Sequence, residues 1–335
     1  MLLNPAIMAL ILVSFVVLLM LLVAAGFAIH LLRFWDMASG SERQLRLERR
    51  TYLISTLLAW AFAAELVSLL LYVYNAESMS GQFVGAMCAT GVLNVNAWGW
   101  PTLFLKVAVF FSGATWLTLN ALDNRGYDYP LIRFKYGLLL LLVPLVATET
   151  WLQLRYFVEL QPDVITSCCG SLFSANDRGV AGEVAAVSPR WAMWSLYLSG
   201  ALVLLAGLFY HRTRRGGLLF GLFAMVAFLI ALVAIVSVIS PYIYAHPEHH
   251  CPFCILKSGH GFAGYLLYIP LFAATAWALG VAVVSPWQRI SSLSEAVSTS
   301  GTRLVRRSLM MFVIFYLSAS GFVYNSTLVM QGVWW

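Results

Sequence analysis

Long apolar stretches dominate this chain and restrict what it can fold into. They run for about 20 residues or more, the length that an α-helix needs to cross the hydrocarbon core of a bilayer. Of the 335 residues, 61% are hydrophobic and only 10% are charged, whereas about a quarter of the residues in a typical soluble protein are charged. Because a helix satisfies its own backbone hydrogen bonds in lipid, we expect an all-α, polytopic integral membrane protein.

We predict about eight transmembrane helices, separated by polar connections that contain Gly, Pro or Asn. The predicted spans are residues 6–32, 52–75, 101–122, 136–157, 191–210, 217–244, 262–284 and 309–330. No internal repeat is visible, and no connection is long enough for a soluble domain. We therefore expect residues 1–335 to form a single transmembrane helical domain.

Basic residues are distributed unequally between the two sides of these spans. Alternate connections hold fifteen of the 20 Lys and Arg residues, and the positive-inside rule places that set in the cytoplasm. Both termini and the loops 76–100, 158–190 and 245–261 then lie outside. The net charge of +6 belongs to loops that face anionic lipid, so the expected partner is a bilayer and not a nucleic acid. A bacterial inner (cytoplasmic) membrane fits this pattern.

All five cysteines of the chain fall in the three outer loops. They are Cys88 in the first loop, Cys168 and Cys169 in the second, and Cys251 and Cys254 in the third. Cysteine is well tolerated in apolar helices, so its confinement to one side indicates chemistry at the outer, periplasmic surface. We expect these five thiols to form the catalytic set of a redox site.

The sharpest motif is Cys251-Pro-Phe-Cys254. A CxxC pair closes a disulfide ring or binds a soft metal, and it becomes reactive where the surroundings stabilise thiolate. We expect Cys254 to lie near the N-terminus of the seventh span, where the helix dipole favours an anion, and Cys251 to be the more exposed, attacking thiol. Ile255 follows the pair where a c-type haem attachment requires His. A static disulfide that staples the loop is the alternative.

The adjacent pair Cys168-Cys169 has two interpretations. A disulfide between neighbouring residues is strained, so one of the two thiols is expected to pair with Cys88 or to exchange with the CxxC pair. Alternatively, the chain holds two ordinary loop disulfides and a spare cysteine. Five is an odd number, so all five cannot be oxidised together within one chain.

The CxxC pair at the outer start of a helix, with Lys257 after it and a second cysteine-bearing loop, resembles quinone-coupled disulfide-generating membrane proteins. These are the disulfide bond formation protein B and vitamin K epoxide reductase families. The resemblance covers about ten residues and departs from the family pattern in the number of spans and in the adjacent cysteines. It implies that Cys251 and Cys254 lie near a quinone and Lys257 beside it. It also implies that Cys168, Cys169 and Cys88 relay oxidising power to a thioredoxin-fold partner.

A cluster of histidines supports a different function. His246, His249, His250 and His260 surround the CxxC pair, and imidazole with thiolate is a ligand set for Cu(I), Zn or Hg(II). The vicinal cysteines also resemble those of mercury-uptake membrane proteins. The alternative is therefore a protein that binds a soft metal or passes it to a metal-carrier protein.

Three ionisable residues fall inside predicted spans: Glu65, Lys106 and Glu149. A charge at bilayer depth costs at least a few kcal/mol and usually has a partner or a function. We expect either a buried acid–base cluster that relays protons, or a Lys106 that extends outward to the interface and carboxyl groups that only join helices.

Together these features predict a membrane thiol–disulfide oxidoreductase with a Cys/His-rich outer face. A quinone is its candidate electron acceptor. The rivals are a soft-metal-binding or metal-transfer protein and a membrane subunit of a respiratory or transport complex. No nucleotide-binding loop, kinase motif or hydrolase motif is present in the sequence.

Overall fold

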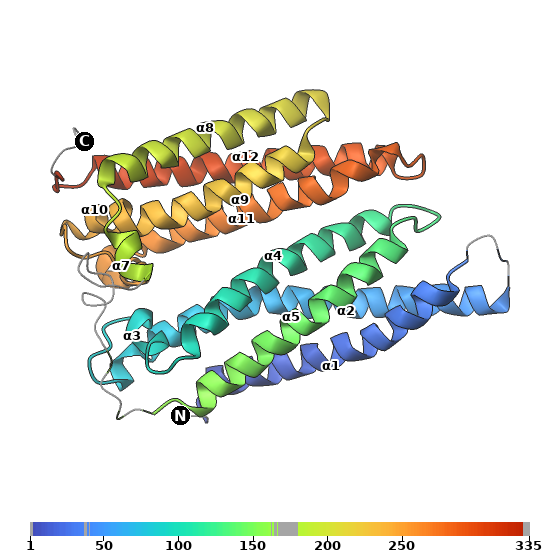
Figure 1. Cartoon of the computed structure of the whole chain (residues 1–335), viewed down its shortest axis with the longest axis horizontal. Helices are drawn as coiled ribbons and strands as arrows, with labels where there is room; N and C mark the ends of the chain where they lie inside the picture. The colour runs from blue at the N-terminus through green and yellow to red at the C-terminus, as the bar shows by residue number, and fades with distance from the viewer. Residues whose placement is uncertain are drawn as a thin grey trace. The chain divides into compact units, whose positions relative to one another are not determined.

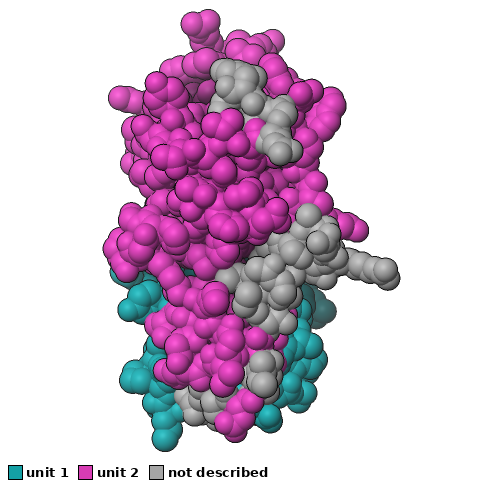
Figure 2. Space-filling model, turned by 90° about the vertical axis from the view of Figure 1, so that its left-hand side faces the viewer, with its two compact units in different colours: residues 1–75, 96–161, 286–299 teal, residues 76–95, 162–285, 300–335 magenta. Residues whose placement is uncertain are grey.

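The computed structural model describes residues 3–36, 39, 41–161, 163, 166 and 180–330. Within these residues the regular structure is entirely helical, which confirms the all-α class. Eight of the described helices are long and apolar enough to cross a membrane, and each overlaps one predicted span. By its internal contacts the chain divides into two compact units, coloured separately in Figure 2.

Unit 1 comprises residues 1–75, 96–161 and 286–299. Its long helices are α1 (Pro5–Phe34), most of α2 (Glu42–Ser78), α4 (Gly99–Asp123) and α5 (Ile132–Val158). Helix α5 packs against both α1 and α4 (Figure 1).

Helix α1 shows how the sequence of unit 1 specifies its packing. The Asn4 side chain caps the helix by accepting a hydrogen bond from the Ala6 amide, at 2.9 Å. Leu10, Val17 and Leu21 are buried at helical spacing, whereas other apolar side chains of α1 are exposed. A helix that is apolar on both its packed and its exposed face is what a lipid environment permits.

Unit 2 comprises residues 76–95, 162–285 and 300–335. Its helices include α8 (Pro189–Thr213), α9 (Gly217–Ala234), α11 (Ala263–Val284) and most of α12 (Ser294–Tyr324). Helix α9 packs against α8 and α11 (Figure 1). A Cβ atom at Gly221 of α9 would lie 2.5 Å from the Cβ of Ala282 in α11, so the close approach of these helices requires glycine there.

Several helices extend beyond their predicted spans, and α2 and α12 differ most. Helix α2 begins at Glu42, whereas its predicted span begins at residue 52. The last helix begins at Ser294 and ends at Tyr324, whereas the predicted span covered 309–330. The first half of α12 contains three exposed arginines, Arg303, Arg306 and Arg307. Arginine is a good helix former, so these polar residues continue the helix beyond its apolar part and do not mark a loop. Helix α5 begins before its predicted span, which places Lys135 inside a helix.

Candidate functional site

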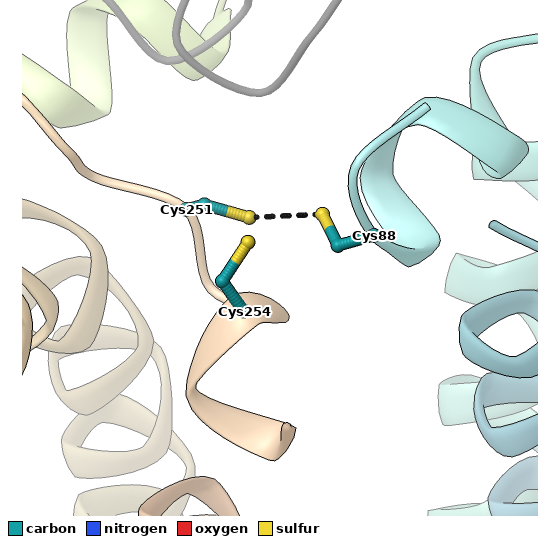
Figure 3. Close-up of side chains that lie close together, drawn as sticks. All are labelled: Cys88, Cys251 and Cys254. Atoms are coloured by element: carbon teal, nitrogen blue, oxygen red, sulfur yellow. Dashed lines mark hydrogen bonds between the residues drawn. The ribbon is translucent and has the colours of Figure 1, made fainter. Parts of the chain in front are cut away.

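The three described cysteines meet in unit 2, although one of them is far from the others in sequence. Cys88 is the N-cap residue of the short helix α3 (Ala89–Leu93), and Cys254 begins the 3-10 helix η3 (Cys254–Leu256). Figure 3 shows their sulfur atoms and that of Cys251 pointing toward one another. All three Sγ atoms lie within 4.8 Å of one another, and this group is called the cysteine cluster below.

The closest sulfur contact joins the two distant segments. Cys88 Sγ and Cys251 Sγ are 3.3 Å apart (Figure 3), across 163 residues of sequence. An S–S bond is about 2.05 Å long, so these two sulfur atoms are in contact without being bonded. Closer approach of the two sulfur atoms, with removal of two electrons and two protons, would convert this contact into a disulfide.

The structure corrects two expectations about the CxxC pair. Helix α11 begins at Ala263, nine residues after Cys254, so the dipole of the seventh long helix does not act at this thiol. Cys251 is also not the more exposed thiol: its exposed fraction is 0%, against 7% for Cys254. The intervening residues form two 3-10 turns, η3 and η4 (Ser258–His260), instead of extending α11.

Polar contacts hold the CxxC segment in place. Thr90 Oγ1 lies 3.3 Å from Cys251 Sγ. The Tyr244 hydroxyl donates to the Cys251 carbonyl at 2.6 Å, and the Tyr268 hydroxyl donates to the Pro252 carbonyl at 2.8 Å. These bonds satisfy backbone groups of a non-helical segment, as a buried segment requires.

An ion pair ties Cys88 to the segment that follows the CxxC pair. Lys257 Nζ lies 3.2 Å from Glu77 Oε1 and also donates to the Met87 carbonyl. The other Glu77 oxygen accepts from the Ala89 amide at 2.8 Å. Burial acts to lower the pKa of Lys257, but the charge and hydrogen bond of Glu77, together with Cys254 and Cys88, raise this pKa above its usual value. Lys257, expected beside a quinone, is thus part of the scaffold around Cys88.

The four histidines do not join the cysteine cluster among the described residues. The group of mutually close ligand atoms contains cysteines alone. His246 is exposed, and His249 and His260 pack edge-on against Tyr244, at ring centroid distances of 4.3 and 4.6 Å. His249 and His260 are therefore positioned by packing around one tyrosine ring.

His250 has a separate role at a helix irregularity. Its Nδ1 lies 3.0 Å from the Val236 carbonyl, within a π-helical segment (Ile235–Ile239) that joins α9 to α10 (Ser240–Tyr244). The Ser240 amide donates to the Ile235 carbonyl, five residues earlier in the chain. In the same register the Val236 carbonyl would accept from residue 241, which is a proline and has no N–H. The His250 ring replaces that missing donor, and its Nδ1 therefore carries the proton.

Cys168 and Cys169 lie outside the described residues. The nearest described residue before them is Thr166, whose amide donates to the Val84 carbonyl at 3.0 Å and whose hydroxyl donates to the Gly91 carbonyl at 2.8 Å. The relay role of Cys168 and Cys169 stays a prediction.

The three ionisable residues predicted inside spans come together in unit 1. Lys106 Nζ lies 2.7 Å from Glu149 Oε1 and donates to Ser68 Oγ at 3.0 Å. The Ser68 hydroxyl lies 3.1 Å from Glu65 Oε2. Lys106 is only 1% exposed, so it does not extend to the interface. The three groups lie together in a buried cluster, and their role in relaying protons stays a prediction.

Sequence reasoning missed several residues that organise these sites. Lys135, counted with the cytoplasmic loops, is buried and lies 2.7 Å from Asp123 Oδ2. Ser68 and Glu77 belong to no sequence motif: Ser68 is a single polar residue in an apolar helix, and Glu77 lies at a helix end. A signal for Ser68 was its helical spacing of three residues from Glu65.

Comparison with protein-family models, with curated proteins and with solved structures finds no match to this chain.

Proposed function

We propose that this protein is a membrane thiol–disulfide oxidoreductase whose exchange centre is the cysteine cluster. The observation that carries the proposal is the 3.3 Å contact between the sulfur atoms of Cys88 and Cys251, with Cys254 in the same group. A CxxC pair in contact with a third thiol has what disulfide transfer requires: an attacking sulfur, a central sulfur and a leaving sulfur.

The internal step conserves electrons. Starting from a Cys251–Cys254 disulfide, the Cys88 thiolate attacks Cys251 Sγ. The Cys88–Cys251 bond forms, the Cys251–Cys254 bond breaks, and Cys254 leaves as a thiolate that takes up a proton in place of the one lost by Cys88. The disulfide has then moved from the CxxC segment to the α3 segment.

The complete cycle needs a two-electron oxidant, which we propose to be a quinone. Oxidation of Cys251 and Cys254 to a disulfide releases two electrons and two protons, which reduce the quinone to a quinol. Cys168 and Cys169 are proposed to pass the disulfide to a thioredoxin-fold partner, because the cysteine cluster itself is buried. We further propose that this face lies outside a bacterial inner membrane, in agreement with the distribution of basic residues.

The test is to trap the exchange intermediate in the purified full-length protein. A Cys254→Ser variant cannot form the CxxC disulfide and lacks the leaving thiol, so the thiol oxidant diamide should join Cys88 and Cys251 in a stable disulfide, identified by mass spectrometry of peptides. A Cys88→Ser variant treated with a short-chain ubiquinone analogue should instead accumulate the Cys251–Cys254 disulfide. Formation of one quinol for each pair of thiols lost would support quinone coupling. Thiols that stay reduced in both variants would contradict the proposal.

A second candidate function is soft-metal binding, and one observation favours it. Three buried sulfur atoms within 4.8 Å of one another form a thiolate set of the kind that selects Cu(I), Zn or Hg(II). Zinc usually takes four protein ligands in structural sites, one more than this group supplies. Stoichiometric metal in the purified protein, lost in each Cys→Ser variant while the thiols stay reduced, would favour this function over thiol–disulfide exchange.

A further inference from the structure

A chain of polar contacts crosses three helices inside unit 1. Glu65 and Ser68 lie on α2, Lys106 on α4 and Glu149 on α5. The contacts run from Glu65 Oε2 to Ser68 Oγ, then to Lys106 Nζ and on to Glu149 Oε1, with lengths of 3.1, 3.0 and 2.7 Å. The three ionisable members are called the buried charge cluster below.

The buried charge cluster is shielded from water. The exposed fractions of Glu65, Lys106 and Glu149 are 2%, 1% and 0%. At 1.5 Å per residue, Lys106 lies about 10 Å along α4 from the helix start and Glu149 about 13 Å from the end of α5. The cluster therefore lies well inside helices that are long enough to cross a membrane.

The charges of this cluster do not balance when all three groups are ionised. Two carboxylates face one ammonium, and the charges that act on Glu65 are the attractive Lys106 and the repulsive Glu149. The aromatic neighbour of Lys106 is Tyr72, whose ring centroid is 5.6 Å from the ammonium and which packs on Tyr156. These phenols are neutral and add no positive charge. An uncompensated negative charge in a medium of low dielectric constant is strongly unfavourable.

Two carboxylate oxygens also lack hydrogen-bond partners. Among the described residues, neither Glu65 Oε1 nor Glu149 Oε2 has one, although both atoms are buried. A buried acceptor without a partner costs about 1–3 kcal/mol and more when charged. Protonation of one carboxyl group removes the excess charge and converts one of these acceptors into a donor.

We infer that Glu65 and Glu149 form a binding site for one exchangeable proton, with Lys106 as its fixed counter-charge. One carboxyl group is protonated while the other pairs with Lys106. A proton suits this site better than a metal cation, because a metal ion requires several oxygen ligands and would be repelled by the ammonium. The inference concerns unit 1 alone and does not depend on the chemistry of the cysteines.

The experiment is infrared spectroscopy of the purified full-length protein in lipid at neutral pH. Solvated carboxyl groups are ionised at this pH, so a C=O stretching band of a protonated carboxyl group reports a buried acid. We expect one such band in the wild-type protein, shifted on transfer from H₂O to D₂O because the proton exchanges.

Both Glu65→Gln and Glu149→Gln should abolish the band, because the remaining carboxylate then pairs with Lys106 and ionises. Glu159→Gln is the matched control: Glu159 is in the same unit but is partly exposed and paired with Arg155, so the band should persist. If one variant fails to fold, loss of the band in the other variant still assigns it to the buried charge cluster. Absence of the band, its survival in both variants, or its loss when NaCl replaces choline chloride would overturn the inference, the last by identifying a sodium site.

Discussion

Lys257 is the side chain that holds both neighbours of Cys88. It donates to the carbonyl of Met87 and pairs with Glu77, which accepts from the amide of Ala89. The ion pair is partly exposed, so its contribution to the free energy of unfolding is modest, about 0–1 kcal/mol. Its effect on the cysteine cluster is therefore one of position, because Cys88 is held between two anchored residues.

Replacing Lys257 should slow disulfide formation without unfolding the protein. For Lys257→Ala we expect the rate of Cys88–Cys251 disulfide formation in a Cys254→Ser background to fall about two- to fivefold, the range that such a pair supports. Quenching with an alkylating reagent at timed intervals measures this rate. Arg190→Ala removes an exposed cation elsewhere in unit 2 and is the control. An unchanged rate in Lys257→Ala would contradict the positioning role.

His260 should titrate at a lower pH than an ordinary histidine. Burial and, second, the nearby Lys257 ammonium lower the pKa of His260 below 6.5. The folded state then binds this proton less readily than the unfolded state, so its contribution to stability is present above pH 6.5 and is lost as the pH falls through the folded pKa.

An NMR titration of the His260 ring is the direct measurement. We expect a midpoint below 6.5 in the wild-type protein and a higher midpoint in Lys257→Ala, because a neighbouring positive charge is removed. A midpoint at or above 6.5 in the wild-type protein would be incompatible with the packing of this ring.

At the scale of elements, the π-helical segment of residues 235–239 and the His250 ring form one structural device. Pro241 cannot donate a backbone hydrogen bond, and His250 supplies the donor that the Val236 carbonyl lacks. The contact anchors the residue that directly precedes Cys251. π-Helical turns often occur near functional sites, and here the irregularity fixes one end of the CxxC segment.

His250→Ala should destabilise unit 2 by leaving the Val236 carbonyl without its partner. The expected loss is about 1–3 kcal/mol, the cost of an unsatisfied buried polar group, measured by thermal or denaturant-induced unfolding in detergent. His246→Ala changes an exposed histidine of the same loop and should leave stability nearly unchanged. Equal effects of the two substitutions would contradict the anchoring role of His250.

At the scale of the whole molecule, the distribution of basic residues predicts which side of the membrane each loop faces. Two exposed positions of unit 2 test this topology. Ser258 follows the CxxC segment, and Arg215 lies in the connection between α8 and α9; both are exposed. A membrane-impermeant maleimide should label Ser258→Cys in intact cells and Arg215→Cys only after permeabilisation. The wild-type protein gives the labelling background. The opposite pattern would reverse the topology and move the cysteine cluster to the cytoplasmic side.

The sequence by itself determined the eight long helices and the proximity of Cys251 to Cys254. Apolar length is a local property, because each stretch must satisfy its own backbone in lipid, and residues three apart are close in any compact conformation. Where polarity and length disagreed, as in the Arg-rich first half of α12, the sequence criterion placed the boundary wrongly, because a helix continues beyond the membrane when its residues favour helix.

Only the tertiary structure decided which distant groups meet. Cys88 joins Cys251 across 163 residues, and Lys106 reaches Glu149 from a different helix. The periodicity of a helix shows which face is apolar but not which neighbouring helix that face meets. The same limit explains the histidines. Their clustering in sequence suggested a metal site, whereas packing around Tyr244 and a hydrogen bond to the Val236 carbonyl determined where three of their rings lie.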